Sequence, residues 1–86
     1  LRPHQAITRS EMAAFLDRAW GGKQEAELAL LPYRDRAFLP LWALESVSRG
    51  YQRGLWSSLG VDYFQPYQPV TRGEAAALLV RIMDAD

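Results

Sequence analysis

Two arginines occupy the same short motif near opposite ends of the chain, and both are candidates for binding an anion. Arg9 lies in Thr-Arg-Ser-Glu at residues 8–11, and Arg72 lies in Thr-Arg-Gly-Glu at residues 71–74. Each motif is predicted to open a helix, where a cation in the first turn costs about 0.3–1 kcal/mol against the helix dipole. A compensating carboxylate is therefore expected. It belongs either to a bound ligand, which the helix N–H groups would also hold, or to the chain itself, with Asp35 the natural candidate.

Aromatic side chains and one glycine complete the candidate ligand-binding set. Trp42 and Trp56 each have a flat ring that could face a sugar; core packing is the better explanation for Trp42, and the two explanations are balanced for Trp56. Gly54 is first a turn requirement and second a point of close ligand approach. The predicted ligand-binding residues are Arg72, Arg9, Asp35, Trp42, Gly54 and Trp56. Tyr63 and Tyr67 are further candidates for stacking, whereas Phe15, Phe38 and Phe64 are predicted to be core.

Composition argues against several classes of function. Ten basic and ten acidic residues in 86 give a formal net charge of zero, which does not favour nucleic acid or an acidic membrane surface as partner. There is no cysteine and His4 is the single histidine, so neither a metal site nor a cofactor is predicted. Paired carboxylates, Asp35 with Glu45 or Asp62, would be needed for a glycosidase, but so small a chain lacks room for a deep cleft. A non-catalytic protein without a membrane span is predicted.

The first arginine motif should be positioned by a helix that begins at Arg9. Residues 8–11 fit a capping box, in which the Thr hydroxyl and the Glu carboxylate each accept a backbone N–H of the other residue. Ile7 and Met12 suit the accompanying hydrophobic staple. Ala13, Leu16 and Trp20 continue one apolar face until Gly21-Gly22 ends the helix.

The second motif repeats this arrangement, with Val70 and Ala75 as its staple. The helix that follows, over residues 75–83, is apolar nearly all round. Such a helix is predicted to be central and buried between neighbours.

Between the motifs, residues 23–31 favour a short helix or a partly ordered linker that Pro32 ends. A further helix is predicted from Pro40, with its apolar stripe formed by Leu41, Leu44, Val47 and Tyr51. Gly54 is preferred over Gly50 as its left-handed cap, because Leu55-Trp56 then supplies the hydrophobic return. Residues 57–69 are predicted to be a loop.

The two motifs belong to a longer duplication, in which residues 3–18 and 66–81 are identical at nine positions in register; this indicates a piece of a repeat array. The middle of the chain adds an ordered set of motifs: Tyr33-x-Asp35, Trp42-Ala43, Gly54-Leu55, Phe64-x-Pro66 and Val70-Thr71-Arg72-Gly73-Glu74. Together these resemble the S-layer homology domain. The resemblance covers one repeat over about residues 32–83 and the last third of another over residues 1–20, where Leu1 replaces the Phe.

The resemblance implies an all-α fold of helix-loop-helix repeats, three of which usually combine into a prism with grooves between them. The expected domains are 1–20, the C-terminal part of a repeat; 21–31, a linker or short helix; and 32–86, a complete repeat. Together they form one domain or part of a three-repeat unit. The implied function is anchoring to a bacterial cell wall at the cell surface, by binding a secondary polysaccharide that carries pyruvate. Two alternatives stay open: packing against other repeats in cis or in trans, and peptidoglycan binding as in related outer-membrane proteins.

Overall fold

The structure is a computed structural model that describes residues 7–21, 24–57, 59–60 and 62–84. These residues form three α-helices, α1 (Arg9–Trp20), α2 (Leu41–Gln52) and α3 (Arg72–Asp84), and two 3-10 turns, η1 (Leu28–Leu30) and η2 (Arg36–Phe38). No strand occurs among them, so the predicted all-α fold is confirmed. Predictions that concern Leu1, Pro3, Gly22 and Lys23 lie outside the described residues.

Helix α1 has both of its predicted ends. The Thr8 hydroxyl accepts the backbone N–H of Glu11 at 3.2 Å, and a Glu11 carboxylate oxygen accepts the backbone N–H of Thr8 at 2.9 Å. These two bonds close the capping box. At the other end Gly21 takes the left-handed conformation with φ 68°, and its N–H donates to the Asp17 carbonyl at 3.3 Å.

Helix α2 begins one residue later than predicted and ends as predicted. Pro40 is its N-cap rather than its first helical residue. Gly54 adopts φ 75° beyond the last turn, and its N–H donates to Tyr51 while the N–H of Leu55 donates to Gly50, both at 3.0 Å. This pair of bonds is a Schellman motif, and Leu55 supplies the buried hydrophobic contact that usually accompanies it.

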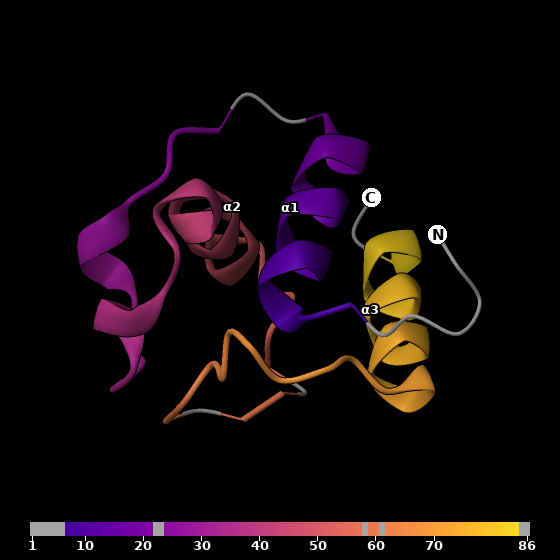
Figure 1. Cartoon of the computed structure of the whole chain (residues 1–86). Coiled ribbons are helices and arrows are strands. Elements are labelled where there is room, and N and C mark those ends of the chain that lie inside the picture. Colours follow the sequence, from indigo (N-terminus) through magenta and orange to yellow (C-terminus); the bar gives the residue numbers. More distant parts are fainter. Residues whose placement is uncertain (1–6, 22–23, 58, 61, 85–86) are drawn as a thin grey trace.

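Helices α1 and α2 pack against each other around the core (Figure 1). The buried face of α2 is rotated from the predicted stripe: Ala43 and Val47 are fully buried, whereas Leu41 and Tyr51 are exposed. Small residues allow this close packing, because Ser46, Ser48 and Gly50 are also buried on α2. The core consists of Ala13, Leu16, Leu31, Tyr33, Leu39, Ala43, Val47, Leu55, Trp56, Phe64 and Leu78. Phe64 is thus core as predicted, but the same prediction is wrong for Phe15 and Phe38, both of which are exposed.

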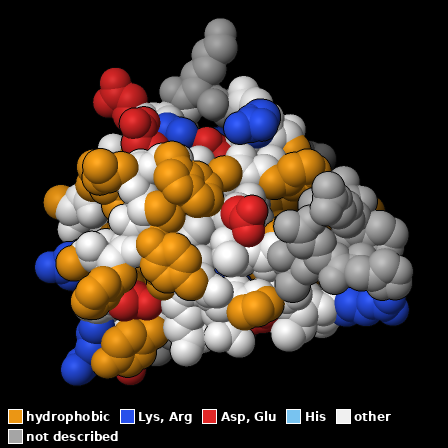
Figure 2. Space-filling view, viewed as in Figure 1, with side chains coloured by type: hydrophobic (Ala, Val, Ile, Leu, Met, Phe, Trp, Pro, Cys, Tyr) orange, Lys and Arg blue, Asp and Glu red, His pale blue; other side chains and the backbone are white. Residues whose placement is uncertain are grey.

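Helix α3 lies at the edge of the described fold, on the other side of α1 from α2 (Figure 1). Leu78 is buried and Ile82 packs partly against the core, but Leu79, Val80 and Met83 are exposed. The prediction of a helix buried on all sides is therefore wrong for this chain, because only one face of α3 has a neighbour. On the face shown in Figure 2, hydrophobic side chains form several separate areas with charged side chains between them.

The segment between α1 and α2 is mostly irregular in its described part. It contains only the turn η1 before Leu31 enters the core. The Gln52 amide fastens it to α2, because its oxygen accepts the N–H of Glu27 at 2.8 Å and its nitrogen donates to the Glu25 carbonyl at 3.1 Å. Among the described helices, none is long and apolar enough to cross a membrane.

Candidate functional site

The segments that lead into the two arginine motifs lie antiparallel to each other. An isolated bridge pairs Thr8 with Pro69. The N–H of Val70 donates to the Ile7 carbonyl at 2.8 Å, and the N–H of Arg9 donates to the Gln68 carbonyl at 3.0 Å. The two copies of the motif are thus in direct contact, although they are far apart in the sequence.

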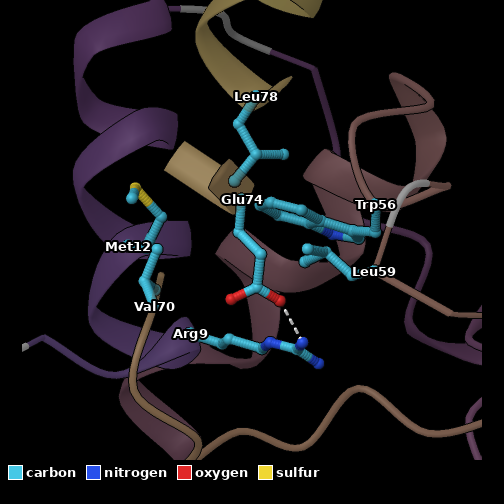
Figure 3. A pocket seen from close by; sticks show the side chains of 7 residues that line it. All are labelled: Arg9, Met12, Trp56, Leu59, Val70, Glu74 and Leu78. Carbon is cyan, nitrogen blue, oxygen red and sulfur yellow. Dashed lines mark hydrogen bonds and ion pairs between the residues drawn. The ribbon is translucent and has the colours of Figure 1, made fainter. Parts of the chain in front are cut away.

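Arg9 is buried, with only 7% of its surface exposed. Its Nη1 donates to the Phe64 carbonyl at 2.9 Å and to the Gln65 side-chain oxygen at 3.2 Å. Its Nη2 forms an ion pair with the carboxylate of Glu74, the last residue of the second motif (Figure 3). The carboxylate that compensates the first arginine therefore belongs to the chain, but it is Glu74 and not Asp35.

Glu74 serves both motifs at once. One of its oxygens accepts the N–H of Thr71 at 3.0 Å, and its own N–H donates to the Thr71 hydroxyl at 3.1 Å, so the second capping box is also formed. The other oxygen accepts from Arg9. The hydrogen bond from the Thr71 backbone, and then the bonds and charge of Arg9, hold the pKa of Glu74 below its ordinary value, against a smaller opposite effect of burial. The capping box in the sequence predicts a partner for one Glu74 oxygen only, so the bond of the other oxygen to Arg9 could not be predicted from it.

Apolar side chains close around the Arg9–Glu74 pair (Figure 3). The cavity around the pair has no room for a water molecule. Besides Arg9 and Glu74, it is lined by Met12, Trp56, Leu59, Val70 and Leu78. A ligand carboxylate therefore cannot reach Arg9 without opening the core. The structure corrects the placement of Arg9 among the ligand-binding candidates.

Arg72 has the opposite environment, although it holds the equivalent position. It is exposed, and no ion pair or hydrogen bond to its guanidinium occurs within the described part of the chain. In α1 the N–H groups of Arg9 and Ser10 donate to the carbonyls of Gln68 and Pro66. The corresponding N–H groups of Arg72 and Gly73 in α3 have no such acceptor among residues 7–21, 24–57, 59–60 and 62–84.

Asp35 fixes the backbone rather than an arginine. Its two carboxylate oxygens accept the N–H of Phe64 at 3.0 Å and the N–H of Gln65 at 2.8 Å. The predicted pairing of Asp35 with an arginine is wrong, since it holds the loop from which Phe64 enters the core. With both oxygens engaged in this way, Asp35 is poorly placed to act in a carboxylate pair with Glu45 or Asp62.

The structure overturns the core prediction for Trp42 and decides the balanced prediction for Trp56 in favour of the core. Trp42 is 61% exposed on α2, so the core explanation is wrong for it. Trp56 is only 2% exposed, and its indole N–H donates to the Val47 carbonyl at 2.8 Å. Its ring packs edge-on against Phe64 and lies where a side chain on Gly50 would stand. Trp56 is thus a core residue and presents no open ring face to a sugar.

Gly54 borders a cleft of about 280 Å³ between the end of α2 and the start of the next loop. The cleft is lined by Pro32, Tyr33, Tyr51, Gly54, Trp56, Ser57 and Gly60. Among the described residues no atom lies within 4 Å of the place where a Gly54 side chain would stand, so its Cα faces open space. Its N–H donates to Tyr51 and its carbonyl accepts from Arg81 at 3.1 Å. Burial, and then the neighbouring Tyr51 and Asp35, raise the pKa of Tyr33 to about 12, which keeps this cleft-lining phenol uncharged.

A second, half-buried charge cluster, which the sequence did not predict, joins α1 to α2. Asp17 accepts from Arg49 at 2.8 and 2.7 Å, from Arg53 at 3.0 Å and from the Ser46 hydroxyl at 3.3 Å. The guanidinium of Arg53 also lies 4.7 Å from the centre of the Trp20 ring. Hydrogen bonding from Arg49 is the main cause that lowers the pKa of Asp17, with burial acting the other way. This cluster holds the two helices together, and we assign no ligand to it.

The geometry defines a small helical repeat domain, in which two capped helices meet through their equivalent motifs. Residues 36–76 match the family model of the S-layer homology domain. The S-layer homology domain that the motifs predict is therefore confirmed over residues 36–76. No curated protein and no solved structure matches the chain.

The family match gives the coarse function. S-layer homology domains anchor S-layer proteins to cell walls, bind cell-wall polymers and are not catalysts, so the match implies association with the cell surface. The matched residues run from η2 through α2 to the first turns of α3. The finer boundaries at residues 20, 31 and 86 stay predictions.

Proposed function

We propose that this chain is a non-catalytic anchoring module that binds a secondary cell-wall polysaccharide through a pyruvylated, anionic sugar, with Arg72 as the anion-binding residue. One observation carries the proposal: Arg72 is exposed at the start of α3, whereas its repeat counterpart Arg9 is buried and paired. The cost of a cation in the first turn is offset by Glu74 for Arg9. For Arg72 we assign the compensating carboxylate to the ligand.

The chemistry at the start of α3 suits a carboxylate. A guanidinium presents paired donors that match the two oxygens of a carboxylate, and the N–H groups of the first turn point toward the same anion. A charge-assisted hydrogen bond contributes about 1.5–3 kcal/mol, which gives selectivity but not tight binding by itself. Several repeats in one protein would supply avidity.

We propose two further residues as sugar contacts outside the first turn of α3. Gly54 has no side chain, which allows a ligand in its cleft to approach the Cα closely. Trp42 has an exposed ring on α2. Asp35 and Trp56 contribute by holding the loop and the core in place. We therefore propose Arg72, Gly54 and Trp42 as contacts, and Asp35, Trp56 and Arg9 as their structural support.

Retention on purified cell wall tests this proposal. The chain should bind native wall and lose most binding to wall from which the pyruvyl groups have been removed. Arg72→Ala should reduce retention on native wall, and Arg18→Ala, which removes an exposed arginine from the other end of α1, should not. Equal retention of the wild type on both walls would contradict the proposal, and retention on peptidoglycan free of polysaccharide would favour a peptidoglycan ligand instead.

A second candidate function is assembly with further repeats, and the exposed side of α3 favours it. A groove of about 280 Å³ between α1 and α3 is lined largely by apolar side chains, including Met12, Phe15 and Leu79. The open first turn of α3 could receive the segment before the motif of another repeat, as α1 receives Pro66 and Gln68 here. Sedimentation would test this: a folded chain that stays monomeric at high concentration would argue against association between chains.

A further inference from the structure

We propose that Phe38 and Tyr67 form a separate binding site for an uncharged sugar ring. This site rests on the proposed function in one respect: the wall polysaccharide would supply the sugar ring. The two side chains border a wide, shallow cleft of about 400 Å³, which neither Arg72 nor Gly54 lines; its lining residues are Asp35, Phe38, Gln65, Pro66, Tyr67 and Gln68.

Both rings are exposed to solvent. Phe38 is 70% exposed at the end of η2, and Tyr67 is 64% exposed in the loop before α3. Phe64 and Pro66, which come from the same loop as Tyr67, are buried. The loop therefore places these apolar side chains inside the protein and leaves Tyr67 at the surface. Aromatic faces bind the C–H faces of sugar rings while leaving the hydroxyl groups in water.

The backbone beneath the rings is held rigidly. Gln65 has φ 58°, a conformation that costs energy for a residue other than glycine. The Asp35 carboxylate accepts the N–H of Gln65, and the Gln65 carbonyl accepts the N–H of Gln68 at 3.0 Å. The carbonyl of Pro66 accepts both the hydroxyl of Ser10 at 2.8 Å and its N–H at 3.1 Å. The loop therefore presents Tyr67 in a fixed position, which lowers the entropy lost on binding.

The polar groups of the cleft favour a neutral ligand. Asp35 is the single charged residue of the lining, and its two oxygens already accept backbone N–H groups. Gln65 and Gln68 are exposed: the Gln68 amide can donate to and accept from hydroxyl groups, and Gln65, whose side-chain oxygen accepts from Arg9, keeps its NH2 group as a donor. An anionic sugar would find no cation here, whereas a hydroxylated ring finds two aromatic faces and two amides.

Titration with released wall-polysaccharide fragments, stripped of their pyruvyl groups, tests this site by NMR. We expect weak binding that shifts the backbone amide signals of Phe38, Gln65, Tyr67 and Gln68. Phe38→Ala and Tyr67→Ala should each weaken binding by about three- to tenfold. Phe15→Ala is the matched control, because it removes a ring of similar exposure, 59%, from α1 outside this cleft. Circular dichroism should show that all three variants stay folded.

The outcomes separate this inference from the proposed function. Wild-type affinity in both Phe38→Ala and Tyr67→Ala, or no binding of the stripped fragments, would overturn the neutral-sugar site. Concentration-dependent self-association that Tyr67→Ala abolishes would overturn it in favour of a protein contact. If Arg72→Ala binds native wall normally while Phe38→Ala does not, the anion site fails and the neutral-sugar site stands.

Discussion

Arg9 and Glu74 form an ion pair between the two copies of one motif, and this pair gives equivalent arginines different roles. The arginine of the first copy reaches the glutamate of the second, which also caps its own helix. The arginine of the second copy is left exposed at the start of α3. A duplicated sequence thus yields one structural and one available guanidinium.

Removing the buried member of this pair should destabilise the fold. Arg9→Ala deprives Glu74 and the buried Phe64 carbonyl of their donor, and we expect a loss of about 2–3 kcal/mol in the free energy of unfolding. Arg72→Ala should change it by less than about 0.5 kcal/mol, because its side chain is exposed. Urea unfolding of both variants measures this difference, and equal stabilities would contradict the assigned roles.

The Asp17 cluster should matter as much as the Arg9–Glu74 pair. Asp17→Asn removes the negative charge shared by Arg49 and Arg53, and we expect it to cost about 2–3 kcal/mol. Glu45→Gln is the matched control, since Glu45 also contacts Arg49 but its side chain is 70% exposed. The control should cost no more than about 0.5 kcal/mol. A wild-type melting temperature for Asp17→Asn would show that the cluster does not join the helices.

Stability should fall in acid. The folded state lowers the pKa of Glu74 from 4.5 and that of Asp17 from 3.8, so the unfolded state binds protons more readily. The stabilisation by these groups is fully present above those ordinary values and is lost as the pH falls through the lowered ones. Thermal unfolding between about pH 7 and pH 3 should show this decline. In Glu74→Gln the decline should be smaller, and an identical pH profile would exclude Glu74 as a contributor.

Two glycines at the end of α2 should respond differently to alanine. A Cβ on Gly50 would stand 2.1 Å from a carbon of the Trp56 ring, so Gly50→Ala must displace a core side chain and should cost about 3 kcal/mol. Gly54→Ala meets no neighbour but must adopt φ 75°, which costs about 1–2 kcal/mol. Comparing the two unfolding free energies tests the packing of Trp56 on α2. The reverse order would contradict it.

Local signals in the sequence predicted the helices well. Both capping boxes and the cap at Gly54 depend on residues within a few positions of one another, so their chemistry is readable from the chain. The predicted stripe on α2 was only partly right, because Val47 is buried but Leu41 and Tyr51 are exposed. Leu41 fits a helical period but has no neighbour to cover it.

The site was predicted less well, because its partners are distant in sequence. The position of Arg9 in the helix showed that it needs a carboxylate, but only the fold could select Glu74 over Asp35. The exposure of Trp42 and the burial of Trp56 likewise depend on how α2 turns against the following loop. Trp56 had one local clue, since Gly50 in the helix leaves space for a large ring.

Binding of pyruvylated polysaccharide fragments by folded Arg72→Ala tests the central claim most directly. Calorimetry should show affinity reduced by about tenfold or more relative to the wild type, as expected for the loss of one charge-assisted contact. Fragments without pyruvate should bind the wild type and Arg72→Ala equally weakly. Unchanged affinity of Arg72→Ala for the pyruvylated fragments would contradict the claim that the exposed arginine of the second motif holds the ligand.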